Sequence, residues 1–393
     1  MTRLRLLTFS TLFPDSVRPG HGVFVENRLR QLVASGAAES TVLAPTPWFP
    51  STHQRFGMYA GFAAVPRFER RNGLDVHHPR YLVIPRFGMN VAPHLLYAAA
   101  RPALARLIRA GLAFDAIDAH YLYPDGVAAT WLGRQFGKPV VITARGSDVT
   151  ELPDHPTPNR LIRQAIRSAA HLIGVSAALC ARLIDLGAAP DRVTTLRNGV
   201  DTAVFHPTDR TASRAALGLT GPTLLSVGHL IARKRNHLTI EALTRLPDTL
   251  LLLAGDGPER GALAALATRL GVGDRVRFLG PRPHHELKHL YTAADAMVLA
   301  SSREGWANVL LESMACGTPV IASDIPGNSE VVQTPAAGRI VTENTPAGIA
   351  AAVSDLFAGP PDRGATLAYA RPFSWDTTTQ GQLDIFRRVI PNI

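Results

Sequence analysis

Short apolar runs alternate with amphipathic stretches along most of the chain, and the two patterns predict strands and helices respectively. In the first half, the apolar runs predict strands near residues 3–9, 40–44, 115–119, 139–143, 171–175 and 192–196. The stretches with helical periodicity predict helices near residues 21–35, 93–110, 125–136, 158–169 and 176–187. Such alternation is typical of parallel sheets covered by helices. Between about residues 45 and 92 the pattern is irregular and rich in proline, and it predicts no particular element.

The alternation starts again in the second half of the chain. LLSVG at residues 224–228 begins a second series of strands, which LLLLAG, VRFLG, AMVLA and PVIAS continue, each followed by a helical stretch. The restart predicts an α/β protein with two stacked Rossmann-like, doubly wound parallel-sheet domains. The expected junction is Asn198 to Pro207, because Asn-Gly and a terminal proline interrupt the pattern there. We therefore expect an N-terminal domain over residues 1–200 and a C-terminal domain over 208–373.

The length of the chain agrees with this division. A chain of 393 residues exceeds what one hydrophobic core usually supports. Ligands of open α/β sheets bind at the carboxyl ends of the strands. With two such domains facing each other, the expected site is the cleft between them.

The composition is that of a globular protein, with 46% hydrophobic and 18% charged residues. No run of about 18 uninterrupted apolar residues predicts a membrane-spanning helix. The apolar stretch near the N-terminus is short and interrupted by polar residues, so it predicts a buried first strand rather than an export signal. The two cysteines, Cys180 and Cys316, suggest neither a disulfide framework nor a metal site. The expected location is the cytoplasm.

The net charge of +10 is concentrated in the first half. Residues 1–206 contain 23 Lys and Arg against 14 Asp and Glu, whereas the remainder contains 18 against 17. Arginines are mixed with aromatic residues in segment 55–86, and such a surface would attract an anionic membrane, a phosphorylated acceptor or nucleic acid. A solvated face without a partner is an equal alternative. No recognition helix or stacking motif accompanies the charge, so we expect no nucleic-acid partner, whereas a peripheral position at the inner face of a membrane agrees with the charge.

The segment Ser301–Asp324 carries the most specific chemistry, because it sets Glu304 and Glu312 eight positions apart around the predicted start of a helix. Unpaired N–H groups and the positive end of the helix dipole gather at such a start, near Gly305 and Asn308. Two carboxylates so placed can accept hydrogen bonds from two separate sets of hydroxyls. The alternative is two ordinary solvated glutamates.

This segment resembles the signature of the retaining, GT-B fold glycosyltransferases of family 4. In that signature Glu-Gly leads, after seven intervening residues, to a second Glu, a run of small residues and Gly-x-Pro-Val. The resemblance implies that Glu304 contacts a donor hexose and Glu312 the ribose hydroxyls of a nucleotide-sugar. The donor-binding candidates in this segment are Glu304, Gly305, Trp306, Ala307, Asn308, Val309 and Glu312.

A cluster of cations follows the strand at 224–228. The diphosphate leaving group of a nucleotide-sugar carries charge that either a metal or fixed cations must stabilise. The segment VGHLIARKRN resembles the family's Val-Gly-Arg-Leu followed by Lys-Gly, and Lys234 matches the lysine that holds the diphosphate. His229 replaces the family's Arg and Arg235 its Gly, so Arg233 is our candidate for the second cation. We therefore expect neither a metal nor a cofactor; a basic helix start exposed to water is the alternative.

Two loop positions complete the donor side, and the final stretch of the chain completes the family's architecture. Gly22 lies in a loop after the first strand, where the family places glycines over the phosphates, although a plain turn is an alternative. Arg282 lies in a loop that resembles one bordering the nucleotide base. The final stretch, about residues 374–393, resembles the C-terminal helix that crosses back to the first domain in this fold.

Two sites in the N-terminal half have family counterparts. His120 matches the histidine at a strand's carboxyl end that reaches the donor sugar, so the catalytic candidates are His120, Glu304 and Lys234. Arg145 replaces the first residue of the family's His-Gly-x-Asp, whose Asp is Asp148 here. These two residues are our acceptor-side candidates, and the replacement suggests an anionic acceptor. Asp148 as a helix cap is the alternative.

The sequence thus predicts a retaining, metal-independent hexosyltransferase that uses a nucleotide diphosphate sugar and a hydroxyl of a glycan or lipid-linked acceptor. Synthesis of a cell-surface polysaccharide or glycolipid is the expected setting. A nucleotide-sugar 2-epimerase of related fold, which would convert the donor without an acceptor, and a nucleic-acid-binding protein are the alternatives.

Overall fold

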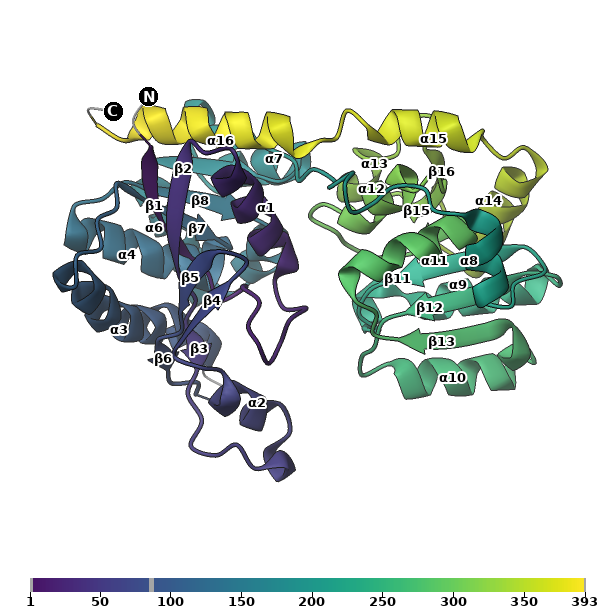
Figure 1. The fold of residues 1–393 in the computed structure, drawn as a ribbon, viewed down its shortest axis with the longest axis horizontal. Helices are drawn as coiled ribbons and strands as arrows, with labels where there is room; N and C mark the ends of the chain where they lie inside the picture. The colour runs from purple at the N-terminus through teal and green to yellow at the C-terminus, as the bar shows by residue number, and fades with distance from the viewer. Residues whose placement is uncertain (1–2, 85–87, 392–393) are drawn as a thin grey trace. The chain divides into compact units, whose positions relative to one another are not determined.

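The computed structural model describes residues 3–84 and 88–391. The chain forms two compact units, the first comprising Met1–Asn198 with Asp376–Ile393 and the second Gly199–Trp375 (Figure 1). The chain leaves the first unit within the segment where the sequence predicts a junction. Within the described ranges, no helix has both the length and the apolar composition needed to cross a membrane.

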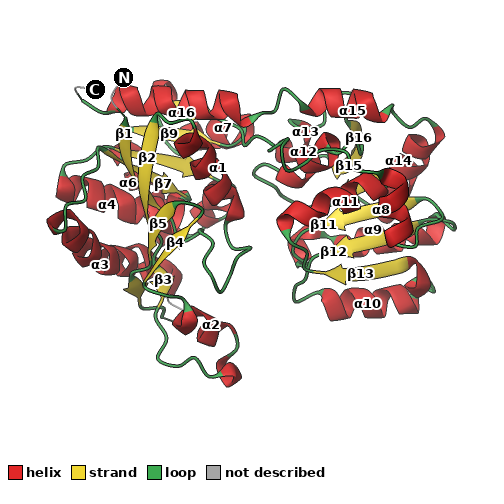
Figure 2. Ribbon diagram, in the orientation of Figure 1, coloured by secondary structure: helices red, strands yellow, loops and turns green. Residues whose placement is uncertain are grey.

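The first unit is built on an eight-stranded sheet covered by helices (Figure 2). The strands are ordered β10-β9-β8-β7-β1-β2-β5-β4, and all neighbours are parallel except β4 and β5. The strands are β1 (Leu4–Phe9), β2 (Ala38–Leu43), β4 (Phe68–Arg71), β5 (Leu74–His77), β7 (Ala116–His120), β8 (Val140–Ala144), β9 (His171–Gly174) and β10 (Val193–Thr195). A separate parallel pair consists of β3 (Thr46–Pro47) and β6 (Arg80–Tyr81). From β1 the chain adds strands first on the side of β2 and then, from β7 onward, on the other side of β1. The carboxyl ends of β1 and β7 therefore form a topological switch point.

The helices of the first unit are α1 (Val23–Ala34), α2 (Met58–Ala64), α3 (Gly88–Arg109), α4 (Val127–Phe136), α5 (Ser147–Thr150), α6 (Pro156–Ser168), α7 (Ala177–Asp185) and α16 (Trp375–Val389). Short turns of helix occur at η1 (Gln54–Phe56), η2 (Leu122–Gly126), η3 (Leu152–Asp154) and η4 (Pro190–Arg192). Helix α16 packs on the sheet, since Leu383 and Phe386 share a buried cluster with Leu4 and Ala116. The last segment of the chain therefore completes the core of the unit that contains the first.

The second unit contains a six-stranded parallel sheet with the order β13-β12-β11-β14-β15-β16. Its strands are β11 (Thr223–Val227), β12 (Leu250–Ala254), β13 (Val276–Gly280), β14 (Ala296–Leu299), β15 (Val320–Ser323) and β16 (Gly338–Val341). Its helices are α8 (Arg210–Ala216), α9 (Asn236–Ala242), α10 (Arg260–Arg269), α11 (Leu287–Ala293), α12 (Asn308–Ala315), α13 (Pro326–Ser329), α14 (Pro346–Ala358) and α15 (Arg363–Ala370), with short turns at η5 (Ala232–Lys234), η6 (Leu243–Arg245), η7 (Gly273–Arg275) and η8 (His284–Glu286). In chain order the strands read 3-2-1-4-5-6, the order of a Rossmann fold, with the switch point between β11 and β14.

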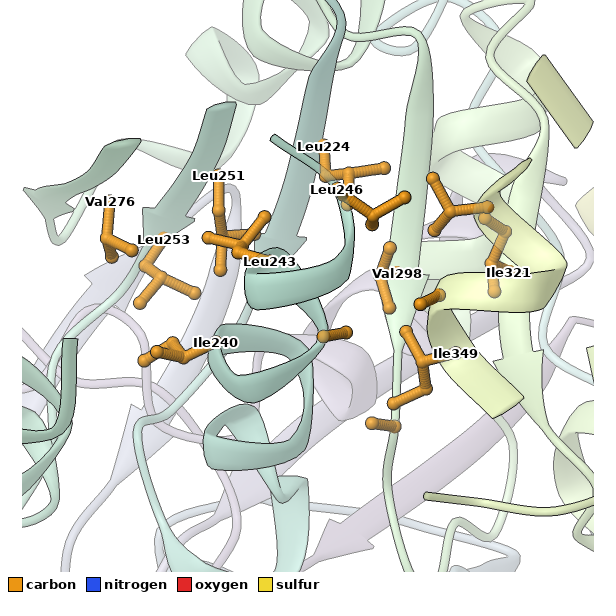
Figure 3. Close-up of a cluster of buried hydrophobic side chains, with 14 of the residues drawn as sticks. Leu224, Ile240, Leu243, Leu246, Leu251, Leu253, Val276, Val298, Ile321 and Ile349 are labelled. Carbon is orange, nitrogen blue, oxygen red and sulfur yellow. The ribbon is translucent and has the colours of Figure 1, made fainter. Parts of the chain in front are cut away.

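One large apolar cluster holds the second unit together (Figure 3). Leu251 and Leu253 from β12 and Val298 from β14 meet Ile240 from α9 and Ile349 from α14. The strands supply near-continuous apolar runs because helices cover them. This packing fixes the ends of β11 and β14, from which the candidate site extends.

The expectation of two doubly wound α/β domains is confirmed. The six strands predicted in the first half correspond to observed strands to within one or two residues at each end. The sequence missed β16 and the elements between residues 45 and 84, where β3 and β6 are only two residues long.

One helix boundary was wrong. We expected a helix from residue 93, whereas α3 begins at Gly88 and contains Pro93 in its interior. A proline leaves the carbonyl four residues earlier without its helical donor. That carbonyl belongs to Met89, and it accepts a hydrogen bond from the Tyr123 hydroxyl instead.

Candidate functional site

Glu304, Lys234 and Arg233 meet beyond the carboxyl ends of β11 and β14, at the switch point of the second unit. β11 leads into the segment that ends with η5, and β14 leads into the loop before α12. The backbone N–H of Ser302 donates to the carbonyl of Arg233 at 2.9 Å and ties the two segments together. The order of the strands therefore explains why residues 70 positions apart form one cluster.

The Glu304 carboxylate accepts hydrogen bonds on both oxygens. Oε1 lies 2.7 Å from Nζ of Lys234 and 2.6 Å from Oγ of Ser301, and Oε2 lies 3.2 Å from Nη1 of Arg233. The Glu304 side chain is 9% exposed and the Lys234 side chain 15%. The site is thus a largely buried carboxylate held between two cations.

Burial works to raise the pKa of Glu304, but the charge and hydrogen bond of Lys234, with Ser301 and Arg233, hold that pKa below its ordinary value. Glu304 is therefore ionised at neutral pH. An ionised carboxylate accepts hydrogen bonds and stabilises positive charge, but it has no proton to give as a general acid.

Gly327 allows α13 to approach this site closely. A Cβ at this position would lie 2.6 Å from the carbonyl oxygen of Glu304 and 3.1 Å from that of Gly305. No side chain fits against those backbone atoms. The glycine therefore holds the backbone of Glu304 and Gly305 in place from one side.

Glu312 lies in α12 and belongs to a second group of side chains. Its Oε1 lies 3.0 Å from Nε2 of His284, and its Oε2 accepts from the Tyr291 hydroxyl at 2.9 Å. Burial works to lower the pKa of His284, but the hydrogen bond and charge of Glu312 raise it above its ordinary value. Phe205 packs its ring edge-on against His284 at 4.9 Å. Glu312 thus lies in the helix that follows the loop of Glu304. The two carboxylates have no hydrogen-bond partner in common among those given above.

The other predicted donor residues surround these two groups. Gly305 to Ala307 form the loop before α12, with Trp306 and Ala307 buried, and Asn308 and Val309 begin the helix. His229 follows β11 and is exposed, as is Arg282 after β13. The donor-binding roles of all these residues stay predictions.

Arg235 takes a left-handed backbone conformation, with φ of 49°. Glycine adopts this conformation without a steric penalty, whereas other L-residues rarely do. The position therefore suits the glycine that the family has after the lysine, and this chain holds an arginine there in the same turn.

In the first unit, His120 ends β7 and is completely buried. Its Nδ1 lies 2.8 Å from Nη2 of Arg145, and its Nε2 lies 3.2 Å from the Asp118 carboxylate. Because a guanidinium can only donate, Nδ1 accepts and the proton resides on Nε2, facing Asp118. Burial lowers the pKa of His120, so the ring is neutral. The structure thus places His120 in contact with the Arg145 guanidinium. The contact of His120 with a donor sugar stays a prediction.

Arg145 lies among buried polar groups from distant parts of the chain. Its Nη1 donates to Asn198 at 3.2 Å, and its guanidinium carbon lies 5.3 Å from the centre of the Phe24 ring. Arg28 donates to the same Asn198 oxygen at 3.3 Å and to Gln382 of α16 at 2.9 Å. Burial, then the charge of Arg28, lowers the pKa of Arg145 to about 9. Arg145 therefore stays a cation at neutral pH.

Asp148 organises the backbone near Arg145. Its carboxylate accepts from the N–H groups of Leu122 at 2.7 Å, Gly146 at 2.7 Å and Arg145 at 3.0 Å. Burial raises the pKa of Asp148 above its ordinary value, although these hydrogen bonds act to lower that pKa. The bonds hold the turn before α5 against η2, and an additional contact with an acceptor stays a prediction.

Gly22 immediately precedes α1 and has φ of 71°, and a Cβ there would overlap the carbonyl group of Leu12. The position requires glycine, which agrees with a tightly folded loop between β1 and α1. Asp125 anchors the start of that loop, since it accepts hydrogen bonds from the backbone N–H of Thr11 and, at 3.0 Å, from its hydroxyl. Burial raises the pKa of Asp125 to about 7.

Sequence reasoning missed Ser301, Gly327, Arg28, Asp118 and the anchoring role of Asp125. Ser301 and Gly327 each follow a predicted strand closely, and that position was an available signal. Arg28 lies in the middle of a helix and its partners lie far away in sequence, so nothing local identified it. Among residues 3–84 and 88–391, no group of three or more His, Cys, Asp or Glu side chains could hold a metal ion.

Comparisons with known proteins give concordant results for both units. Residues 209–372 match the family described as Glycosyl transferases group 1, and residues 20–204 match Glycosyltransferase Family 4. A D-inositol 3-phosphate glycosyltransferase from Frankia alni is 35% identical over 305 residues, which are 70% of this chain and 75% of that protein. One of the same name from Mycobacterium bovis is 34% identical over 301 residues, which are 70% of this chain and 62% of that protein.

Solved structures show the same fold. Sucrose-phosphate synthase from Thermosynechococcus elongatus has a TM-score of 0.80 at 20% identity, covering 98% of this chain and 99% of that one. The Anabaena protein HepE in complex with UDP and glucose has a TM-score of 0.75 at 20% identity, covering 98% and 100%. At this identity the likeness concerns the fold alone.

Proposed function

The chain belongs to the GT-B fold glycosyltransferases of family 4, and from that premise we propose that it transfers a hexosyl unit from a nucleotide diphosphate sugar to a hydroxyl group with retention of configuration. The observation that carries the proposal is the pairing of Glu304 with Lys234 and Arg233 at the switch point of the second unit. Retention rests on the family resemblance.

The two cations suit a diphosphate. An ammonium has three donors and a guanidinium five, and Glu304 uses one of each. Their charge, fixed in a largely buried site, stabilises the negative charge that develops on the diphosphate as the glycosidic bond breaks. Because side chains supply this charge, we propose that transfer requires no divalent cation.

Glu304 suits the sugar. As an ionised carboxylate it accepts hydrogen bonds from sugar hydroxyls and stabilises a sugar that has become oxocarbenium-like. The acceptor hydroxyl then attacks the face from which the diphosphate leaves, and an oxygen of that diphosphate takes its proton. In this scheme Glu312 accepts hydrogen bonds from the ribose hydroxyls, which replace its hydrogen bonds to His284 and Tyr291.

For the acceptor, we propose a glycan or lipid-linked hydroxyl in cell-surface polysaccharide or glycolipid synthesis, with Arg145 as the candidate contact to an anionic group. The glycosyltransferase WaaG, described as involved in lipopolysaccharide biosynthesis, shares the fold with a TM-score of 0.71 at 18% identity. The relatives named for inositol 3-phosphate make that compound a necessary member of any acceptor screen.

The test is a donor screen followed by product analysis. UDP-, GDP- and ADP-sugars are compared for thermal stabilisation, since a ligand that binds only the folded state raises Tm. The stabilising donor is then incubated with candidate acceptors, with and without a chelator. We expect an acceptor-dependent glycoside with retained anomeric configuration in both conditions.

Two outcomes would contradict the proposal. Conversion of the donor without any acceptor would identify an epimerase. Loss of transfer on chelation, restored by a divalent cation, would show that Lys234 and Arg233 do not suffice for the diphosphate.

A further inference from the structure

Exposed apolar side chains are concentrated in one part of the first unit. Of the ten large hydrophobic residues exposed within the described ranges, nine lie between residues 17 and 89. They are Val17, Trp48, Met58, Tyr59, Phe68, Leu82, Val83, Ile84 and Met89. Met58 is 70% exposed and Leu82 is 56% exposed. The tenth is Ile184 on α7, which is 39% exposed.

Most of these residues lie on elements that contact one another. Trp48 follows β3, and its N–H donates to the carbonyl of Tyr81 in β6 at 2.7 Å. Residues 82–84 continue from β6, helix α2 packs against β3, and α3 packs against β6. Figure 1 shows β3, β6 and α2 together at one end of the first unit. We call Trp48, Met58, Tyr59, Leu82, Val83, Ile84 and Met89, with Arg55 and Arg67, the Trp48 surface.

Aromatic contacts support this surface from within. The Phe49 ring lies 5.2 Å from that of Phe56 and 5.3 Å from that of Tyr59. The Arg55 guanidinium lies 4.6 Å from the centre of the Phe56 ring. Helix α2 thus packs against its own small aromatic cluster, and its exposed residues belong to an ordered helix.

The charge of the region is strongly positive. Residues 40–114 contain nine arginines and no lysine, against two acidic residues. One of these, Glu69, lies 2.9 Å from His78, and the other, Asp75, lies 3.7 Å from Arg70. Arg55 and Arg67 are exposed. The Trp48 surface therefore combines exposed apolar side chains with the exposed arginines Arg55 and Arg67.

We propose that the Trp48 surface docks on an anionic lipid bilayer. Aliphatic side chains gain free energy by entering the acyl region, aromatic rings favour the headgroup level, and arginines near the surface attract anionic lipids. Exposed apolar side chains gathered on elements that contact one another mark an interaction site. The proposal does not depend on the donor, the acceptor or the chemistry of transfer.

The charge argues against the other occupants. A two-fold symmetric contact between copies of this chain would bring the same arginines together, since such an interface uses the same patch twice. Nucleic acid would leave Leu82, Val83 and Ile84 without apolar partners. A bilayer with anionic headgroups satisfies both the charge and the apolar residues.

The test measures co-sedimentation of the full chain with vesicles of phosphatidylcholine alone or mixed with phosphatidylglycerol. We expect binding to the mixed vesicles, weakened by high salt because the arginine contribution is screened. The double variant Leu82→Ser/Ile84→Ser should bind about tenfold or more weakly, because two apolar side chains are lost. Arg55→Glu/Arg67→Glu should also weaken binding about tenfold or more.

Matched controls lie outside the surface. Ile184→Ser removes the tenth exposed hydrophobic residue, and Arg245→Glu reverses an exposed charge in the second unit; both should bind like the parent. Tryptophan fluorescence gives a second measurement, since Trp48 should shift to shorter wavelength on mixed vesicles and the shift should disappear in Trp48→Phe. Unchanged Tm would show that each variant folds.

Equal binding to neutral and mixed vesicles, absence of binding to both, or equal loss in the control variants would overturn the proposal. So would a dimer or a nucleic-acid complex that the Leu82→Ser/Ile84→Ser variant abolishes while vesicle binding persists. Failure here would leave glycosyl transfer in solution unaffected, so the two proposals fail separately.

Discussion

Glu304 depends on Ser301 as well as on its two cations. The Ser301 hydroxyl donates to the oxygen that Lys234 contacts, and so helps to fix the orientation of the carboxylate. A hydrogen bond to a charged group contributes about 1.5 to 3 kcal/mol. Its removal should therefore affect catalysis more than the loss of a surface hydroxyl would.

We predict that Ser301→Ala lowers kcat about tenfold or more, with a smaller change in KM for the donor, because a carboxylate that stabilises the transition state is displaced. Ser302→Ala is the matched control, since its exposed hydroxyl donates to the carbonyl of Arg233 at 3.3 Å rather than to Glu304. Steady-state kinetics of the two variants checks the prediction. Equal kinetics in both variants would show that Ser301 does not position Glu304.

Asp125 should make stability depend on pH. Its pKa is about 7 in the folded protein, mainly because of burial, whereas an unfolded Asp titrates near its ordinary value. Between these values the folded state binds more protons than the unfolded state, so the free energy of unfolding falls as pH rises and levels off above the folded pKa. Asp125→Asn removes this dependence and keeps an acceptor for Thr11.

Chemical unfolding of the parent and of Asp125→Asn between pH 5 and 8 checks this prediction. The stability of the parent relative to the variant should fall by about 2 to 3 kcal/mol across this range, since about two pKa units of the titration lie within it and one unit corresponds to about 1.4 kcal/mol. A constant difference across this range would mean that Asp125 does not titrate there.

At the scale of elements, α13 packs closely against the loop before α12, and Gly327 makes this close packing possible. We predict that Gly327→Ala destabilises the second unit by about 1 to 3 kcal/mol and reduces transfer, because the added methyl group displaces the backbone of Glu304 and Gly305. Gly261→Ala is the matched control: it lies in α10 with no atom within 4 Å of the new methyl group, and should stabilise by about 0.5 to 1 kcal/mol. Thermal unfolding and transfer assays decide between these outcomes, and a fully active Gly327→Ala variant would be incompatible with the close contact.

Periodicity predicted the long, buried elements well because burial imposes a regular apolar pattern. It failed for β3 and β6, since two residues carry no pattern, and for the start of α3, where Pro93 looked like a first turn. It placed Glu304 and Lys234 each in a segment after a predicted strand, whereas their common site was implied by the family resemblance, because periodicity does not give the order of strands in a sheet. It could not show that His120 lies beneath Arg145, since their contact depends on side-chain orientation across two strands.

The first unit depends on the last segment of the chain for its stability. Leu383, Ile385, Phe386 and Ile390 from the end of the chain lie in its core, and Gln382 is a partner of buried Arg28. A chain ending at Trp375 would expose this core and leave Arg28 without that bond. The second unit, with its own core, does not include α16 beyond Trp375.

We predict that truncation after Trp375 unfolds the first unit and leaves the second folded. Calorimetry should show loss of one transition, while Leu383→Ala/Phe386→Ala should only lower its Tm, since each truncated core side chain costs about 2 to 5 kcal/mol. A truncated protein that retains both transitions would contradict this account of α16.

At the scale of the whole molecule, we assign the diphosphate to Lys234 and the sugar to Glu304. Binding of a nucleoside diphosphate with and without its sugar separates these two roles most directly. The measurement is calorimetric titration of the parent, Lys234→Ala and Glu304→Gln with the nucleoside diphosphate of the stabilising donor and with the intact donor. Lys234→Ala should weaken both ligands about tenfold or more, whereas Glu304→Gln should spare the nucleoside diphosphate and abolish transfer. Undiminished affinity of Lys234→Ala for both ligands, or full transfer by Glu304→Gln, would contradict the account.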